Sequence, residues 1–247
     1  MPEPIEGAGT AEQQWRAWQW ERFPALAPLQ LVPPGARAVV VSPHPDDEVL
    51  GCGGLLASLA AARDLLLVAV TDGTASHPGS GYWSAARLAR ARPAETAAAL
   101  GILGASAGAL VRLGIADGQV GAHEEAIAAR LRALLRPGDI VFCTWRGDGH
   151  PDHEGTGRAC ARAVLGLPVR LAEFPVWAWH WSTPGDARVP WHRLHRIPLT
   201  RGALRLKRRA LQAFRSQIEP DPASGAPPVL PGHVLARFVR PFESFLL

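Results

Sequence analysis

The chain has 247 residues, of which 47% are hydrophobic and 19% are charged, and its formal net charge is +4. This composition excludes a disordered or fibrous chain and is typical of a globular protein large enough to bury a core. The basic residues are scattered except near Lys207, where the spacing favours a solvated helix face, so no nucleic-acid partner is indicated.

The cysteine spacing and the lack of long apolar runs are the sequence features that bear on the cellular compartment. Cys52, Cys143 and Cys160 show no paired spacing, which is typical of a reducing compartment and argues against a disulfide framework. The first residues contain no signal-like apolar segment, and no apolar run approaches the roughly 18 residues needed to span a bilayer. We therefore expect a cytoplasmic protein without a membrane span.

Tryptophans mark the beginning of the chain. Trp15, Trp18 and Trp20 fall within residues 1–36, which end in two prolines and a glycine that would stop a helix. We expect this segment to be a helical arm packed on the core. The next run, residues 38–42, is rich in β-branched side chains and predicts a strand buried on both faces.

Helices and strands alternate after this first strand. Helices are expected at residues 48–62, 84–103, 122–135 and 154–165, and strands at residues 65–70, 110–113, 139–144 and 169–174. The alternation predicts an α/β fold with a Rossmann-like parallel sheet and helices on both faces, in which ligands bind at the carboxyl ends of the strands. The expected organisation is a single domain, with the arm at 1–36, the core at 37–217 and a C-terminal tail, 218–247, that wraps the surface.

An unusual concentration of charge follows the first predicted strand. Residues 43–48 read Pro-His-Pro-Asp-Asp-Glu, which places His44 close to Asp46 and Asp47 in a short loop. A divalent cation would turn the repulsion between such carboxylates into coordination, and imidazole with carboxylate is a ligand set that suits zinc. Taken alone, the acidic residues are explained equally well by a helix N-cap with charges at the positive end of the helix dipole.

A second polar loop follows the fourth predicted strand. Residues 144–154 contain His150, Asp152 and His153. In a parallel sheet the two loops would lie at the same edge, and together they offer more ligands than one zinc ion needs. Such a surplus is typical of a catalytic zinc site, which has three protein ligands and an open position for water. A joint metal site therefore explains the pair of loops better than two unrelated caps.

The two loops resemble the signature of the PIG-L/LmbE-like family of zinc-dependent N-deacetylases. That signature is a His-Pro-Asp-Asp-Glu segment after the first strand and a His-Pro-Asp-His segment further on. Residues 44–48 and 150–153 match it in order, and the resemblance extends over roughly residues 36–217. The family's fold and activity are therefore expected here.

The resemblance implies a role for each residue of the first loop. His44, Asp47 and His153 would bind Zn²⁺, which lowers the pKa of water towards about 7. Asp46 would be the general base that takes a proton as water attacks the amide carbonyl. Adjacent residues of a loop point apart, so one carboxylate can hold the metal while its neighbour reaches the water.

The resemblance also implies a role for the second loop. His150, oriented by Asp152, would act as a cation that stabilises the oxyanion or protonates the leaving amine, because a nearby carboxylate favours the charged form of an imidazole. An alternative is that His150 supports the metal ligands without touching the substrate.

Further residues are candidates for substrate contact. Arg92 lies in an Arg-x-x-Glu stretch similar to one whose arginine contacts substrate hydroxyls in the family, although a helix-surface ion pair has the same pattern. Asp117 lies in an Asp-Gly turn similar to the family's sugar-binding turn, and an ordinary turn explains it equally well. Trp177, Trp179 and Trp181 alternate as on one face of an extended segment, where burial is favoured over stacking on a sugar.

The expected function is therefore an N-deacetylase that hydrolyses the acetyl amide of a small-molecule substrate, an N-acetylated amino sugar or a related polar conjugate.

One alternative is a zinc hydrolase acting on another N-acyl or ester substrate; phosphoester hydrolysis usually needs two metals. A nucleotide-binding Rossmann-like module is suggested by Gly51, Gly53 and Gly54, but the acidic loop before them would repel phosphates. A metal-binding protein without activity would need neither Asp46 nor His150. The identity of the substrate and the oligomeric state stay open.

Overall fold

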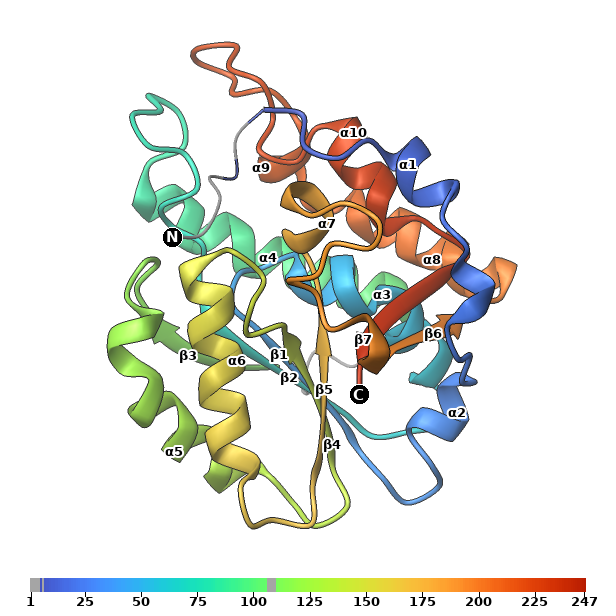
Figure 1. Cartoon of the computed structure of the whole chain (residues 1–247). Helices are drawn as coiled ribbons and strands as arrows, with labels where there is room; N and C mark the ends of the chain where they lie inside the picture. Colours follow the sequence, from blue (N-terminus) through green and yellow to red (C-terminus); the bar gives the residue numbers. More distant parts are fainter. Residues whose placement is uncertain (1–4, 6, 106–109) are drawn as a thin grey trace.

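A seven-stranded sheet forms the centre of the computed structural model, which describes residues 5, 7–105 and 110–247 (Figure 1). The strand order is β3-β2-β1-β4-β5-β7-β6; the first five of these run parallel, and β7 is antiparallel to both β5 and β6. The strands are β1 (Ala38–Ser42), β2 (Leu65–Thr71), β3 (Leu110–Ile115), β4 (Ile140–Thr144), β5 (Arg170–Phe174), β6 (Leu194–Pro198) and β7 (Phe242–Leu246). The predicted α/β fold is confirmed, with an antiparallel addition at one edge.

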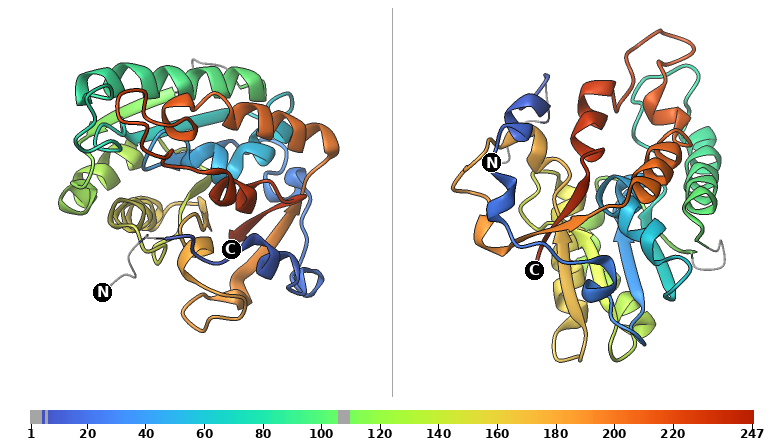
Figure 2. Two further views of the ribbon diagram at one scale, coloured as in Figure 1. Left: turned by 90° about the horizontal axis from the view of Figure 1, so that it is seen from above. Right: turned by 90° about the vertical axis from the view of Figure 1, so that its right-hand side faces the viewer.

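Helices cover both faces of this sheet (Figures 1 and 2). On one face α3 (Asp47–Leu59), α4 (Ala85–Leu103) and α8 (Arg201–Leu211) pack together, and on the other α5 (Glu124–Leu134) packs on α6 (Pro151–Val164). The shorter elements are α1 (Glu12–Arg16), η1 (Trp20–Arg22), α2 (Pro28–Leu31), η3 (Val120–His123), α7 (Ala178–Trp181), η4 (Trp191–Arg193), α9 (Arg215–Ile218), α10 (Gly232–Leu235) and η5 (Ala236–Phe238). In the part of the chain that the structure describes, none of the helices has the length and apolar character needed to cross a membrane.

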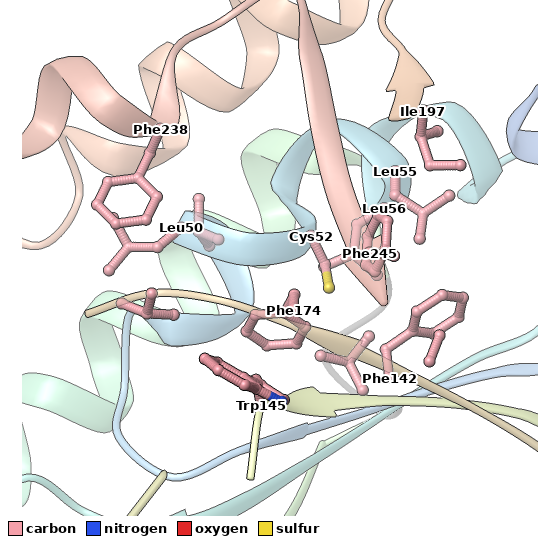
Figure 3. Close-up of a cluster of buried hydrophobic side chains, with 14 of the residues drawn as sticks. Leu50, Cys52, Leu55, Leu56, Phe142, Trp145, Phe174, Ile197, Phe238 and Phe245 are labelled. Atoms are coloured by element: carbon pink, nitrogen blue, oxygen red, sulfur yellow. The ribbon is translucent and has the colours of Figure 1, made fainter. Parts of the chain in front are cut away.

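Strand β1 is apolar from Ala38 to Val41 because it separates two cores. Val40 belongs to the cluster under α3 and α8, whereas Val39 and Val41 belong to the cluster under α5 and α6. Successive side chains of a strand point to opposite faces, so a central strand covered by helices on both sides needs apolar residues at every position. Figure 3 shows the first core, where Phe142 of β4 contacts Phe245 of β7 with ring centroids 5.3 Å apart.

The glycines that follow the first motif lie inside α3 and serve close packing. A Cβ atom at Gly51 would lie 2.1 Å from the ring of Phe174, and one at Gly54 would lie 2.3 Å from Leu199. Only glycine lets α3 approach the sheet this closely, and α3 carries Asp47 at its first position. These glycines are therefore part of the core and do not form a phosphate-binding loop.

The end of the chain differs from the expected surface tail. Residues 242–246 form β7, which lies between β5 and β6, and the strand is mostly buried. Glu243 is buried with it, and its carboxylate accepts hydrogen bonds from Lys207 Nζ at 2.6 Å and from the backbone N–H of Gly54 and Leu55. A short segment with an acidic residue is typical of a surface strand, and the buried lysine of α8 together with these two N–H groups makes the burial of Glu243 possible.

The tryptophans of the arm pack against those after β5. Trp15 contacts Trp179 with ring centroids 5.1 Å apart, and the guanidinium of Arg240 lies over both rings. The predicted extended arrangement of residues 177–181 is wrong, because residues 178–181 form the helical turn α7, which points the rings in different directions. Trp181 instead stacks on Trp145, so packing accounts for most of this tract.

Candidate metal centre

The two motif loops meet at the carboxyl ends of β1 and β4. These strands are neighbours, and the strand order reverses direction between them, which is where ligands bind in open α/β sheets. A pocket of about 410 Å³ opens at this point. All eight residues predicted for the site line it: His44, Asp46, Asp47, Arg92, Asp117, His150, Asp152 and His153.

Three side chains converge at the bottom of the pocket. The Oδ2 atom of Asp47 lies 3.4 Å from Nδ1 of His44 and 3.3 Å from Nε2 of His153. In a tetrahedral zinc site with bonds of about 2.0–2.1 Å, ligand atoms are about 3.3–3.4 Å apart, so these separations fit such an ion. His150 is close enough to be a further ligand, since a ring nitrogen of each of the three histidines lies within 4.8 Å of the others.

Each of the two converging histidines has a carboxylate on its other ring nitrogen. Nδ1 of His153 is 2.8 Å from Asp148 Oδ2, and Nε2 of His44 is 3.2 Å from Asp152 Oδ2. Metal-binding histidines in proteins commonly donate their second N–H to a carboxylate in this way, which orients the ring and leaves the other nitrogen for the metal. The donor set and its support therefore fit zinc.

Asp148 is a member of the site that the sequence reasoning did not single out. It is fully buried, and its carboxylate also accepts the backbone N–H groups of residues 176, 177 and 178. Its only sequence signal is its place between Gly147 and Gly149 in the polar loop, which does not distinguish it from a turn residue. The structure shows that it ties His153 to the turn after β5.

Asp152 contacts a different histidine from the expected one. Its carboxylate faces His44 and accepts the backbone N–H groups of Gly118 and Val120, while only its backbone N–H reaches His150, donating to Nδ1 at 3.2 Å. Without a carboxylate partner, His150 is not favoured as a cation: burial and the neighbouring imidazoles of His153 and His44 lower the pKa of His150 to about 3. Because Nδ1 accepts a hydrogen bond, the neutral ring carries its proton on Nε2.

Asp46 has an unusual backbone conformation. Its φ of 130° makes it the single non-glycine residue with positive φ among the described residues. Such strain persists only where the surrounding structure enforces it, and it is concentrated at functional sites. Burial raises the pKa of Asp46 to about 8, although Arg92 opposes this, with Nη2 3.1 Å from Oδ2.

Arg92 is an interior residue, so the alternative of a helix-surface ion pair is wrong. It is 3% exposed and donates to the carbonyl oxygens of Gly73 and Pro45 as well as to Asp46. A Cβ at Gly73 would lie 2.0 Å from the guanidinium, so glycine is needed for this approach. Asp117 also bonds within the protein: its carboxylate accepts the backbone N–H groups of Gly73 and Ala75.

The site concentrates buried carboxyl groups. Near its centre the buried carboxylates outnumber the buried cation Arg92, and they are Asp46, Asp47, Glu48, Asp148 and Asp152. The same excess acts on the imidazoles: burial alone would lower the pKa of His153, but Asp47 and Asp148 raise it to about 10. A divalent cation would pair with these carboxylates in place of protons.

Comparison with known proteins identifies the family. The model of the PIG-L family, described as GlcNAc-PI de-N-acetylase, matches residues 39–164, which is half of the chain and contains both motif loops. The chain belongs to the PIG-L family. The resemblance inferred from the two loops is thus confirmed for this PIG-L protein, although no curated protein sequence matches it.

Solved structures share the PIG-L fold at low sequence identity. N,N'-diacetylchitobiose deacetylase from Pyrococcus horikoshii is 23% identical with a TM-score of 0.58, over 74% of this chain and 70% of that chain. A zinc-inhibited form of teicoplanin deacetylase is 18% identical with a TM-score of 0.58, over 74% and 85%. A 4-carboxy-2-hydroxymuconate hydratase from Pseudomonas putida is 20% identical with a TM-score of 0.52, over 74% and 80%. Because deacetylases and a hydratase share the fold, the reaction has to be argued from the site.

Proposed function

We propose that this protein is a zinc-dependent N-deacetylase that hydrolyses the acetyl amide of an N-acetylated amino sugar or a related small conjugate. The observation that carries the proposal is the convergence of His44 Nδ1, Asp47 Oδ2 and His153 Nε2 at separations that suit one tetrahedral ion. Membership of the PIG-L family supports the reaction class, and two of the three structural neighbours described above are deacetylases.

These three side chains would hold the ion. Zinc in this position would supply a Lewis acid that polarises an amide carbonyl and lowers the pKa of water towards about 7. Asp148 and Asp152 would act as positioning residues, because each holds one imidazole ring through its second nitrogen. Three protein ligands leave room for water and substrate, as hydrolysis requires.

Asp46 would act as the general base. Its carboxylate lies next to the ligand Asp47 in the chain but points to Arg92, so it is available beside the reacting water without competing for the metal. It would take the proton from water as the oxygen attacks the amide carbon, and return a proton to the nitrogen as the C–N bond breaks. Arg92 would keep this carboxylate oriented and favour its charged form.

His150 would stabilise the charge that develops on the carbonyl oxygen. A neutral ring with its proton on Nε2 is a hydrogen-bond donor, and its accepting Nδ1 is fixed by the backbone N–H of Asp152. A donor held in place before the reaction stabilises an oxyanion without reorganisation. This role replaces the cationic one expected from the sequence.

The test is metal analysis combined with acetate release over a panel of N-acetylated amino sugars and their conjugates. We expect about one zinc ion per chain, acetate and free amine in equal amounts, and loss of turnover on chelation that zinc reverses. A purified protein that binds no divalent metal would contradict the proposal. Cleavage of esters or longer amides alone would assign the same centre to another hydrolase reaction.

A further inference from the structure

The pocket has two ends of opposite character. Asp47 and His153 lie at its bottom and are at most 2% exposed, whereas Val229 at its mouth is 37% exposed. Carbon-rich side chains form another part of the lining, from Val176 and Leu230, which are 3% and 4% exposed, to the partly exposed Trp177 and the exposed Val229. We call Val176, Trp177, Val229 and Leu230 the apolar wall.

The apolar wall comes from two segments outside the motif loops. Val176 and Trp177 belong to the turn between β5 and α7, and Val229 and Leu230 to the loop between α9 and α10, which rises above the carboxyl edge of the sheet (Figure 1). Neither segment lies within residues 39–164, which match the family model. The wall is therefore a feature of this chain beyond the matched region.

Hydrogen bonds hold the apolar wall in place. The backbone N–H groups of Val176 and Trp177 donate to Asp148, the same carboxylate that supports His153. Leu230 N–H donates to the carbonyl oxygen of Gln217 at 2.8 Å. One buried carboxylate thus fixes Val176 and Trp177 relative to the metal end.

Further hydrogen bonds hold the loop between α9 and α10, which carries Val229 and Leu230. The carboxylate of Asp221 accepts the backbone N–H groups of Ala223 and Ser224, and it also accepts the hydroxyl of Ser80 from the loop after β2. These contacts join two loops around the mouth. A wall that is ordered before binding loses little entropy when a ligand packs against it.

The polar residues expected to bind sugar hydroxyls bond mainly to the protein itself, although the Nε of Arg92 is buried without a partner. Arg92 bonds to Gly73, Pro45 and Asp46, and both oxygens of Asp117 accept backbone N–H groups. A hydroxyl-rich substrate would have to compete with these bonds. An apolar group at the mouth would instead remove carbon surface of the wall from water.

We propose that the preferred substrate carries an aryl or alkyl group on the amine side of its N-acetyl amide, and that this group packs against the apolar wall. The substrate class is an N-acetylated amino sugar linked to an apolar aglycone. This inference rests on the proposed function, since an acetyl amide cleaved at the metal end leaves the larger, amine-bearing part of the substrate towards the mouth. The wall would act as a specificity determinant and take no part in the chemistry.

The experiment compares N-acetylglucosamine with its phenyl and octyl 1-O-glycosides. Turnover is followed by acetate release, and binding is measured by titration calorimetry on zinc-loaded D46N protein, which would bind without cleaving. We expect the Kd of both glycosides to be at least about tenfold lower than that of the free sugar, with kcat/KM rising in parallel. The substitution Val229→Ser should reduce this preference about threefold, because it removes an apolar contact at an exposed position.

Leu165→Ser is the matched control. Leu165 is 76% exposed and lies at the end of α6 opposite to His150, so this change removes a similar exposed apolar side chain away from the pocket. We expect it to leave the preference unchanged. A preference that persists in both V229S and a Trp177→Ala variant would show that the wall is not its cause.

The outcomes separate this inference from the proposed function. Acetate release with equal Kd values for all three compounds would overturn the inference alone. Tighter binding of the glycosides without acetate release from any compound would overturn the deacetylase and leave the wall as a binding surface. Faster cleavage of N-octanoyl than of N-acetyl glucosamine would place the apolar group on the acyl side and contradict its position on the amine side.

Discussion

The metal end and the mouth of the pocket are built on different principles. At the metal end charged groups are paired with one another: Asp47 with two histidines, His153 with Asp148, and Asp46 with Arg92. At the mouth the apolar wall presents separate side chains whose contributions depend on contact area. Loss of one group at the metal end leaves another buried and unpaired, so we expect large effects there and small, additive ones at the mouth.

The largest effect should come from the general base. In the Asp46→Asn protein we expect kcat to fall by about 10²- to 10⁴-fold, because the amide cannot take a proton from water. Zinc content should stay near that of the unmodified protein, since Asp46 points to Arg92 and away from the three converging atoms. Near-full activity in steady-state kinetics would remove Asp46 from this role.

The next largest effect should come from Asp148, which holds His153 at the metal end. Asp148→Asn replaces a buried carboxylate that holds His153 and three backbone N–H groups. Zinc affinity, measured by competition with a chromophoric chelator, should fall by about 10- to 100-fold. Asp186→Asn, on a surface loop where the carboxylate pairs with Arg188, is the control and should leave the affinity unchanged. Unaltered affinity in a folded D148N protein would separate Asp148 from the metal.

A smaller effect concerns the pH profile. Burial raises the pKa of Asp46 to about 8 and Arg92 lowers it, so removing the guanidinium should raise this pKa further. A general base acts in its deprotonated form, and activity therefore rises as the pH passes this pKa. In Arg92→Met the acidic limb of kcat/KM should move to higher pH by about one unit or more. Arg90→Met, exposed on the same helix, is the control; a limb that moves to lower pH contradicts the assignment.

The smallest effect belongs to the mouth. Trp177→Ala removes a ring from the apolar wall, and we expect KM for aryl or alkyl conjugates to rise about threefold with kcat unchanged, as for uniform binding. Leu29→Ser, an exposed apolar position on α2 of the N-terminal arm, is the comparison and should leave KM as it was. A fall in kcat without a change in KM would assign Trp177 to the metal end and contradict the proposed difference between the metal end and the mouth.

Much of the fold was predictable because its signals are local. The run of valines in β1 and the apolar spacing of α3 predict a β-α unit from adjacent residues alone. β7 was missed because its burial depends on Lys207, which lies 36 residues away in α8 and neutralises Glu243. A partner so distant in the chain leaves no periodic signal around the strand.

In the site, too, the features with local sequence signals were predicted, and those that depend on contacts between distant residues were not. The two motifs predicted which residues converge, because the side-chain types that bind a metal and their spacing are visible in a few adjacent residues of each loop. The pairing of Asp152 with His44 joins residues 108 apart, so sequence proximity suggested His150 in error. For Arg92 the sequence left substrate contact and a helix-surface ion pair open; the residue lies inside, since its neighbours come from the loops after β1 and β2.

The sequence by itself determined the chemistry available at the carboxyl edge: imidazoles and carboxylates in two loops, each after an apolar strand. Only the tertiary structure decided how these groups are divided, with Asp47 facing two imidazoles, Asp148 and Asp152 behind them, and the apolar wall above. The physical reason is that a ligand is recognisable by its chemical type, whereas its partner is set by which strands lie side by side in the sheet.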